Sequence, residues 1–255
     1  MELISLLNTI NTPLEAEGVP TYIVGGFIRD SILKLPPKDL DLVIQGDKES
    51  ILPVILRSTN IKSVFDDSKN KITKLTLDTS LEDTTIQDID IQFTREDIIQ
   101  NLSHRDFSIN SMALKLSEYN DTHINNAVLD PFSGLDDIKS KNIKFIQQSI
   151  FSDNPIRLLR AVRLASTLKF RITPETANAI KNNAALVTKC PAENISFELL
   201  EILANDNAKA HIEIKKKYNE VLTVIIPRHV ERTNKIKEEL SKLELKVTLL
   251  SLIHI

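Results

Sequence analysis

A pair of glycines constrains the fold of this chain more than any other local feature. Gly25-Gly26 follows the short apolar run Tyr22-Ile23-Val24, whose composition predicts a β-strand. A helix is expected over residues 27–33, and it must stop before Pro36-Pro37, because proline lacks an amide hydrogen and restricts the preceding residue. The chain is therefore expected to form a strand, a tight glycine turn and a short helix, in that order.

The next expected strand carries two acidic side chains on one face. Residues 39–44 read DLDLVI, and alternate positions of a strand share a face, so Asp39 and Asp41 should point the same way. Two such carboxylates can hold two divalent cations for phosphoryl transfer, and hard oxygen ligands favour Mg²⁺. Backbone amides at Gly25-Gly26 can approach a phosphate closely. The spacing predicts a triphosphate site beside two Mg²⁺ ions.

Further strands are expected at residues 63–65, 72–77 and 86–93, which together with the first two would form a small mixed sheet. The last of these strands supplies a candidate third carboxylate, Asp90. Asp88 is its rival, because both residues lie on the same face of the strand and parity leaves the choice open.

The second part of the chain has a helical pattern and the opposite charge. Residues 1–150 contain 15 Lys and Arg against 23 Asp and Glu, whereas residues 151–255 contain 17 against 12. An acidic part suits cations and a basic part suits a polyanion such as RNA. Hydrophobic spacing and prolines predict helices over residues 155–168, 174–186, 193–204, 208–222 and 230–251.

Composition excludes several classes of protein. No apolar run approaches the roughly 20 residues of a membrane-spanning helix, and the amino terminus lacks a basic start and a signal-peptide cleavage site. We therefore expect a cytoplasmic location and no membrane partner. Cys190 is the single cysteine, so an internal disulfide is impossible and a structural zinc site is disfavoured.

The residues quoted above belong to a set of motifs that resembles a known family. GGFIRDSIL at residues 25–33 and KDLDLV at residues 38–43 are similar to the signature of class II tRNA nucleotidyltransferases and bacterial poly(A) polymerases. Further similar blocks follow in family order: HRDFSINSMA at 104–113, DPFSG at 130–134, NPIRLLRAVR at 154–163 and AENI at 192–195. The resemblance spans about residues 22–203.

The resemblance implies an α/β head of the nucleotidyltransferase (DNA polymerase β-like) type with a small mixed sheet, followed by an all-α neck and a partial body. The implied boundaries are residues 1–140 for the catalytic head, 141–204 for the neck and 205–255 for the start of the body. The chain stops within an apolar helical stretch where family members continue, so we expect a truncated form.

The implied activity is template-independent transfer of CMP from CTP to the 3′ end of tRNA, either alone, as in a CC-adding enzyme, or followed by AMP from ATP. A poly(A) polymerase of the same fold is one alternative, and a non-catalytic RNA-binding relative is another. The resemblance supports Asp39 and Asp41 as catalytic residues and metal ligands, and Asp90 is the expected third catalytic carboxylate, with Asp88 left open as its alternative. The implied nucleotide-binding residues are Gly25, Gly26, Arg29, Arg105, Asp106, Asn110, Asp153, Asn154, Arg157, Arg160 and Arg163.

Two departures from the family pattern bear on the choice of substrate. The connection at residues 97–104 is short, which resembles the CC-adding members and also some compact CCA-adding ones. In the family, an aspartate and an arginine three residues apart read the base. Arg157 fits the arginine, but the partner position holds Asn154, whose amide also donates, and the neighbouring Asp153 is a substitute acceptor of poorer geometry.

We predict that Asn154→Asp tightens selection of CTP and ATP over UTP, because a carboxylate accepts from the exocyclic amine of C or A and cannot donate to uracil. Incorporation of single labelled nucleotides measures this selection. Equal misincorporation of UTP by both proteins would contradict the prediction.

Overall fold

The computed structural model describes residues 3–37, 39–68, 71–78, 86–119 and 127–203. The chain divides into two compact units, residues 1–150 and residues 151–255, and each is described by itself. The expected start of a body domain at residues 205–255, with helices over 208–222 and 230–251, lies outside the described residues.

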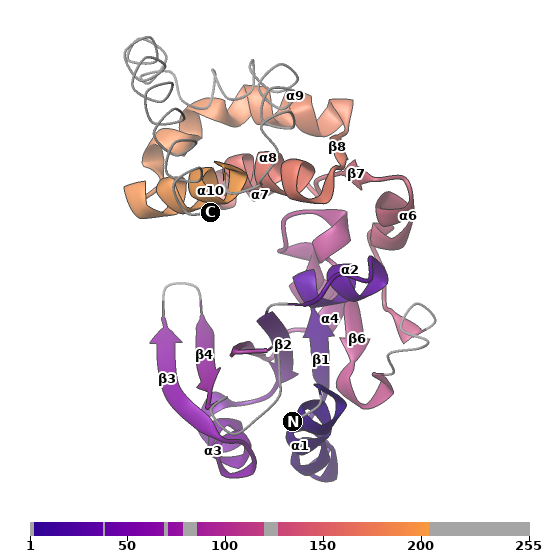
Figure 1. The fold of residues 1–255 in the computed structure, drawn as a ribbon, viewed down its shortest axis with the longest axis vertical. Helices are drawn as coiled ribbons and strands as arrows, with labels where there is room; N and C mark the ends of the chain where they lie inside the picture. Colours follow the sequence, from indigo (N-terminus) through magenta and orange to yellow (C-terminus); the bar gives the residue numbers. More distant parts are fainter. Residues whose placement is uncertain (1–2, 38, 69–70, 79–85, 120–126, 204–255) are drawn as a thin grey trace, which may run out of the picture. The chain divides into compact units, whose positions relative to one another are not determined.

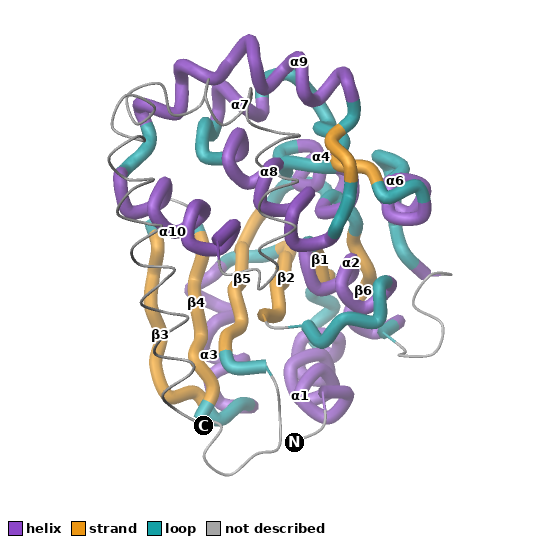
Figure 2. Tube along the Cα trace, turned by 45° about the horizontal axis from the view of Figure 1, so that its top comes forward, coloured by secondary structure: helices purple, strands orange, loops and turns teal. Residues whose placement is uncertain are grey.

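The first unit is built on a six-stranded mixed sheet with the strand order β3-β4-β5-β2-β1-β6 (Figures 1 and 2). β2 and β5 run parallel, and all other neighbouring strands of this sheet are antiparallel. The strands are β1 (Thr21–Val24), β2 (Asp39–Gln45), β3 (Ile61–Asp67), β4 (Ile72–Leu77), β5 (Asp88–Thr94) and β6 (Ala113–Lys115). The short strand β7 (Asn142–Ile143) follows later in the chain.

Helices and helical turns connect these strands. They are α1 (Leu3–Ala16), α2 (Gly26–Ile32), α3 (Lys48–Ser58), α4 (Ile98–Ser103), η2 (Ser108–Asn110), η3 (Leu116–Glu118) and α6 (Gly134–Lys139). The strand, glycine turn and helix expected around residue 25 are present as β1, Gly25 and α2. The mixed α/β architecture predicted for this part of the chain is confirmed.

One face of the sheet is buried and largely apolar, with Thr21 and Thr73 as buried polar residues on it. Leu40, Leu42 and Ile44 of β2 and Ile89 and Ile91 of β5 are almost fully inaccessible to solvent. Helices α1 and α3 pack on each other and bury further aliphatic side chains, Leu6, Leu7, Ile10, Leu14, Ile51 and Ile55. Because strand residues alternate between faces, this burial directs Asp39 and Asp41 to the opposite face.

A smaller apolar cluster lies on that opposite face, further along the strands. Val24, Val43 and Ala113 pack there against Ile98 and Leu102 of α4. Val43 and Asp41 are two residues apart in β2 and therefore lie on the same face of the strand. The acidic residues of β2 are thus next to the apolar cluster on which α4 packs. Helix α4 is thus fixed beside the acidic face.

The second unit is helical in its described part, as its sequence predicted. It contains α8 (Arg157–Leu168), α9 (Pro174–Asn183), η4 (Ala184–Lys189), α10 (Ala192–Leu203) and the short strand β8 (Arg171–Ile172). Helix α7 (Ile150–Asp153) precedes α8. Helices α8 and α10 pack together, and Leu158, Leu159 and Val162 of α8 are fully buried.

Several element boundaries differ from those that the sequence predicted. The helix expected from residue 155 begins at Arg157, because Pro155 lies in the turn between α7 and α8. The helix expected over 174–186 ends at Asn183 and continues as the 3₁₀ turn η4. The short connection at residues 97–104 is almost entirely helical, since the Asp97 carboxylate caps the amide of Ile99 at 2.8 Å.

We predict that Leu102→Ala lowers the free energy of unfolding by about 2–5 kcal/mol, because the truncation leaves a cavity in the cluster under α4. Ile99→Ala is the matched control, since Ile99 lies on the same helix with 48% of its surface exposed, and its effect should stay within about 0.5 kcal/mol. Urea denaturation measures both values. Similar losses in the two variants would show that α4 is not seated by this cluster.

Candidate active site

Four carboxylates lie in two neighbouring rows on one face of the sheet. The parallel register pairs Asp39 of β2 with Asp88 of β5, and Asp41 with Asp90. Directly paired residues share a face, and adjacent strands are about 5 Å apart, so the four side chains form a compact acidic patch. Asp39 is exposed and the other three are partly buried.

The glycine turn lies directly against Asp41. Gly25 has φ 74° and ψ −138°, a conformation that residues with a Cβ rarely adopt. A Cβ added there would lie 2.8 Å from Asp41 Oδ2 and 3.0 Å from Arg105 Nη1. The missing side chain of Gly25 therefore leaves room for the Asp41 carboxylate and the Arg105 guanidinium. Asp41 and the Gly25 turn, predicted to act together, are brought together by the fold.

Asp88 and Asp90 share a lysine on the neighbouring strand. Lys74 Nζ of β4 lies 3.3 Å from Asp88 Oδ2 and 3.8 Å from Asp90 Oδ1. Thr76 donates a hydrogen bond of 2.9 Å to the other oxygen of Asp88. Asp90 Oδ1 is buried and has no hydrogen-bond partner among the described residues. Asp88 is therefore held by two groups, whereas Asp90 keeps an oxygen available for another ligand.

The pKa values of Asp90 and Lys74 are both shifted by their surroundings. Burial raises the pKa of the Asp90 carboxyl, and the charges of Asp41 and Asp39 add to this effect, although Lys74 opposes it. The pKa of Lys74 is also raised: burial alone would lower it, but the charges of Asp90, Asp88 and Asp39 outweigh burial. The local field is thus strongly negative and attracts a cation.

A chain of hydrogen bonds links the helix after the glycine turn to the predicted nucleotide-binding residues Asn110 and Asp106. Arg29 donates two bonds to Asp30, at 2.8 and 2.9 Å, and one of 2.5 Å to Asn110 Oδ1. Asn110 Nδ2 in turn donates to Asp106 Oδ1 at 3.0 Å. Asp106 is buried and also accepts from the amide of Phe107 at 2.8 Å. Arg29, Asn110 and Asp106, far apart in sequence, thus form one connected group.

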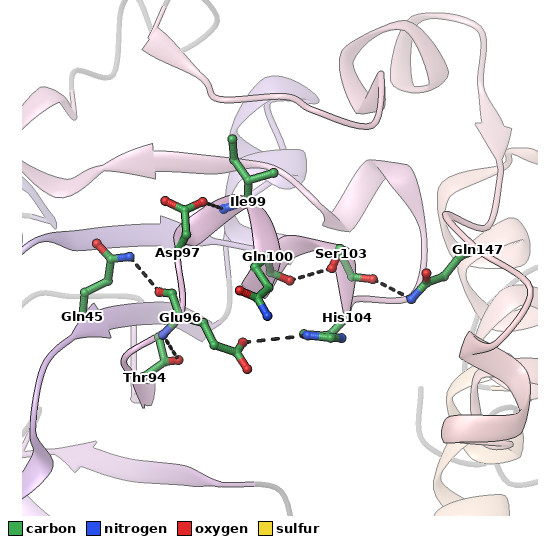
Figure 3. Close-up of polar contacts among 9 residues, drawn as sticks. All are labelled: Gln45, Thr94, Glu96, Asp97, Ile99, Gln100, Ser103, His104 and Gln147. Carbon is green, nitrogen blue, oxygen red and sulfur yellow. Dashed lines mark hydrogen bonds and ion pairs between the residues drawn. The ribbon is translucent and has the colours of Figure 1, made fainter.

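Polar contacts fix the segment around α4, as Figure 3 shows. Gln45 Nε2 donates to the Glu96 carbonyl at 2.8 Å, and Gln147 Nε2 donates to the Ser103 carbonyl at 3.0 Å. The Glu96 carboxylate lies 3.8 Å from His104 Nε2, so the residues that flank α4 on its two sides are in contact. The bond from Gln45 thus attaches residues 96–104 to the end of β2.

The predicted base-reading residues lie at the start of α8 in the second unit. Asp153 ends α7, and Asp153 and Asn154 are exposed. The backbone amide of Arg157 donates to the Asn154 carbonyl at 3.1 Å, which closes a turn directly before α8. The two residues therefore lie at opposite ends of one short turn.

Arg160 and Arg163 share one buried carboxylate. Glu198 of α10 is 2% exposed, and its two oxygens lie 3.4 Å from Arg160 Nε and 2.5 Å from Arg163 Nε. The Arg160 side chain is 39% exposed, against 20% for Arg163. Arg163 therefore makes the shorter and more buried contact between α8 and α10, and the side chain of Arg160 is more exposed to solvent.

Lys74, Thr76 and Glu198 were not identified as site-forming residues from the sequence. Alternating Leu75 and Leu77 indicate only that Lys74 and Thr76 lie on one face of a strand. That these two residues adjoin Asp88 and Asp90 depends on the antiparallel register of β4 and β5. No local signal in the sequence specifies this register.

The DPFSG block, which the resemblance includes, stabilises a turn in this structure. The Asp130 carboxylate accepts from the amides of Gly134 and Leu135, at 2.7 and 2.9 Å, and so caps the start of α6. The buried Asp137 on the same helix accepts from the Ser108 hydroxyl at 2.6 Å. Helix α6, whose start the block caps, thereby supports the turn at Ser108, between Asp106 and Asn110.

The acidic patch provides hard oxygen donors that suit a divalent cation such as Mg²⁺, which commonly uses one or two protein carboxylates together with substrate phosphates and water. Over residues 3–37, 39–68, 71–78, 86–119 and 127–203, three or more His, Cys, Asp and Glu side chains nowhere converge as a metal cluster.

The described helices do not include one that is both long enough and apolar enough to cross a membrane.

Two family models match the chain. Residues 21–144 match the poly(A) polymerase head domain, and residues 169–227 match the probable RNA- and SrmB-binding site of polymerase A. The chain is 30% identical over 197 residues to a CC-adding tRNA nucleotidyltransferase of Halalkalibacterium halodurans, which covers 76% of this chain and 47% of the relative. It is also 30% identical over 215 residues to a CCA-adding enzyme of Levilactobacillus brevis, covering 74% of this chain and 48% of the relative.

The fold is similar to that of a solved structure of the Thermotoga maritima CCA-adding enzyme complexed with tRNA. The TM-score is 0.71 with 27% sequence identity, over 89% of this chain and 52% of the other. The chain thus spans about half the length of the relatives that it matches.

We predict that Gly25→Ala lowers the free energy of unfolding by about 1–3 kcal/mol through backbone strain and weakens Mn²⁺ binding, because the new Cβ displaces the Asp41 carboxylate. Gly18→Ala is the matched control. Gly18 also has a positive φ of 68°, but a Cβ added there would meet no heavy atom within 4 Å, so strain occurs without a clash. Urea denaturation and Mn²⁺ titration by electron paramagnetic resonance measure the two effects. Unchanged Mn²⁺ affinity in Gly25→Ala would contradict the role assigned to the turn.

Proposed function

The chain belongs to the family of class II tRNA nucleotidyltransferases and bacterial poly(A) polymerases, and we propose that it transfers CMP, and AMP, from CTP and ATP to the 3′ end of tRNA without a nucleic-acid template. The observation that carries this proposal is the position of Asp41 against the Gly25 turn, with Asp39 on the same strand face. Binding of RNA alone requires no such pair of carboxylates beside a glycine turn.

In the proposed reaction, Asp39 and Asp41 hold two Mg²⁺ ions, and Asp90 is the third carboxylate. Ions bound there would lower the pKa of an attacking hydroxyl and would neutralise charge on the departing pyrophosphate. Asp90 is preferred over Asp88 because its buried oxygen has no hydrogen-bond partner among the described residues, whereas Asp88 is held by Thr76 and Lys74. The backbone of Gly25 and Gly26, at the start of α2, lines the proposed triphosphate pocket.

We assign recognition of the ribose to Arg105 and Asp106. The chain of hydrogen bonds from Asp30 through Arg29 and Asn110 orients the buried Asp106 carboxylate. An oriented carboxylate accepts hydrogen bonds from ribose hydroxyls and thereby discriminates against a deoxyribose that lacks one of them.

Base selection is assigned to Asn154 and Arg157 at the start of α8, with Asp153 as a neighbouring acceptor. Cytosine and adenine both present an amine donor beside a ring-nitrogen acceptor, which suits a carbonyl oxygen and a guanidinium. Among the two arginines further along α8, Arg160 is the proposed phosphate ligand, because it is more exposed than Arg163.

The proposed partner is the 3′ end of tRNA. Residues 151–255 contain more Lys and Arg than Asp and Glu, which suits binding to the phosphates of RNA.

We propose the boundaries 1–140 for the head and 141–204 for the neck. A cytoplasmic location accords with this function, since tRNA, CTP and ATP are cytoplasmic substrates.

Incubation of the protein with tRNA lacking its CCA end and with single labelled nucleotides tests the proposal. Asp41→Asn should reduce incorporation on the order of 10²–10³-fold or more, because the loss of one carboxylate disrupts the site that stabilises the transition state. Asp136→Asn, the same change at an exposed position on α6, should leave incorporation intact.

The products of this assay separate the alternatives. Two C residues followed by a stop identify a CC-adding enzyme, and a final A identifies a CCA-adding one. Long A tails would instead identify a poly(A) polymerase. RNA binding without incorporation of any nucleotide, in the wild-type protein, would overturn the enzymatic proposal in favour of a binding module.

A further inference from the structure

Lys74 places a cation at the edge of the acidic patch. It lies on β4, directly opposite Asp90 in the antiparallel register, while Thr76 lies opposite Asp88. Its ammonium is 3.3 Å from Asp88 Oδ2 and 3.8 Å from Asp90 Oδ1. Strand β4 lies on the side of β5 away from β2 (Figure 2), so the lysine approaches the two carboxylate rows from their outer side.

The two contacts of Lys74 differ in character. Asp88 receives the shorter contact and is also bound by Thr76 at 2.9 Å, so it anchors the lysine. Asp90 Oδ1 has the longer contact at 3.8 Å, beyond hydrogen-bond distance. The ammonium thus neutralises Asp90 partially without saturating the oxygen that a metal ion would use.

We infer that Lys74 acts as a built-in cation that competes with a divalent metal for Asp90 and thereby sets the metal affinity of the site. This inference rests on the proposed function, which places metal ions at Asp39 and Asp41. Asp88, which is itself bound by Thr76, holds the ammonium in place, and Lys74 is a positioning residue that acts through Asp90. Its charge relieves the repulsion among the four carboxylates when no metal is bound.

Two consequences follow for the protein. Loss of the ammonium removes a like charge close to the bound metal and exposes Asp90 fully, so divalent cations should bind more tightly. At about 0.15 M ionic strength, with partial screening, we expect roughly tenfold tighter binding. The metal-free protein should also become less stable, because the Lys74 charge no longer offsets the repulsion among the four carboxylates.

Mn²⁺ titration by electron paramagnetic resonance, without nucleotide or RNA, tests the inference directly. Lys74→Met should bind Mn²⁺ roughly tenfold more tightly than the wild type. Lys74→Arg keeps the charge and should stay close to the wild-type affinity. Lys62→Met removes the same charge from an exposed position on the edge strand β3 and should leave the affinity unchanged.

Thermal unfolding with and without Mn²⁺ provides a second readout. A ligand stabilises the folded state more as its affinity rises, so Mn²⁺ should raise the melting temperature of Lys74→Met more than that of the wild type. Should Lys74→Met not fold, Lys74→Gln, which retains a polar side chain, replaces it in both measurements.

The outcomes distinguish the inference from the proposed function. Equal Mn²⁺ affinities in Lys74→Met and the wild type, or equal tightening in Lys74→Met and Lys62→Met, would overturn the inference while leaving the metal site intact. Mn²⁺ binding that Asp41→Asn does not weaken would instead overturn the metal site itself, and with it the proposed function. If Lys74→Met binds Mn²⁺ more tightly and Lys62→Met does not, the result supports both the role of Lys74 and the proposed metal site.

Discussion

The parallel register between β2 and β5 places four carboxylates side by side, and the chemistry of the first unit depends on how those charges are held. Like charges directly opposite each other destabilise a sheet, so this arrangement opposes folding locally. The buried aliphatic residues on the other face of the same strands supply the stability that offsets it. Such a local conflict within an otherwise consistent fold is expected where a ligand binds.

The surroundings of the patch are held in a way that suits catalysis. Gly25 brings the backbone against Asp41, and the contacts from Arg29 to Asn110 and Asp106 join helix α2 to the turn that carries the proposed ribose-binding pair. Helix α4 is seated on Val24 and Val43 and tied to β2 through Gln45. Side chains held by packing and hydrogen bonds lose little freedom when a substrate binds, which favours an oriented transition state.

The second unit is organised around a buried charge. Glu198 is almost inaccessible to solvent and is matched by Arg160 and Arg163, which fixes α10 against α8. A buried carboxylate is tolerated only when it is paired, so these contacts define the relative position of the two helices. The same helix α8 begins with Arg157, and the proposed base-reading turn is therefore carried by a helix whose orientation is set three and six residues later.

Local periodicity, together with glycine and proline geometry, is enough to predict the strand, glycine turn and helix around residue 25, the shared face of Asp39 and Asp41, and the helical character of the described second unit. The sequence alone could not show that Asp90 Oδ1, unlike Asp88, has no hydrogen-bond partner among the described residues, place Lys74 beside these two carboxylates, or show that Glu198 holds Arg163. Those features depend on strand register and on helix packing, which join residues far apart in the chain and leave no local signal. Only the tertiary structure decided them.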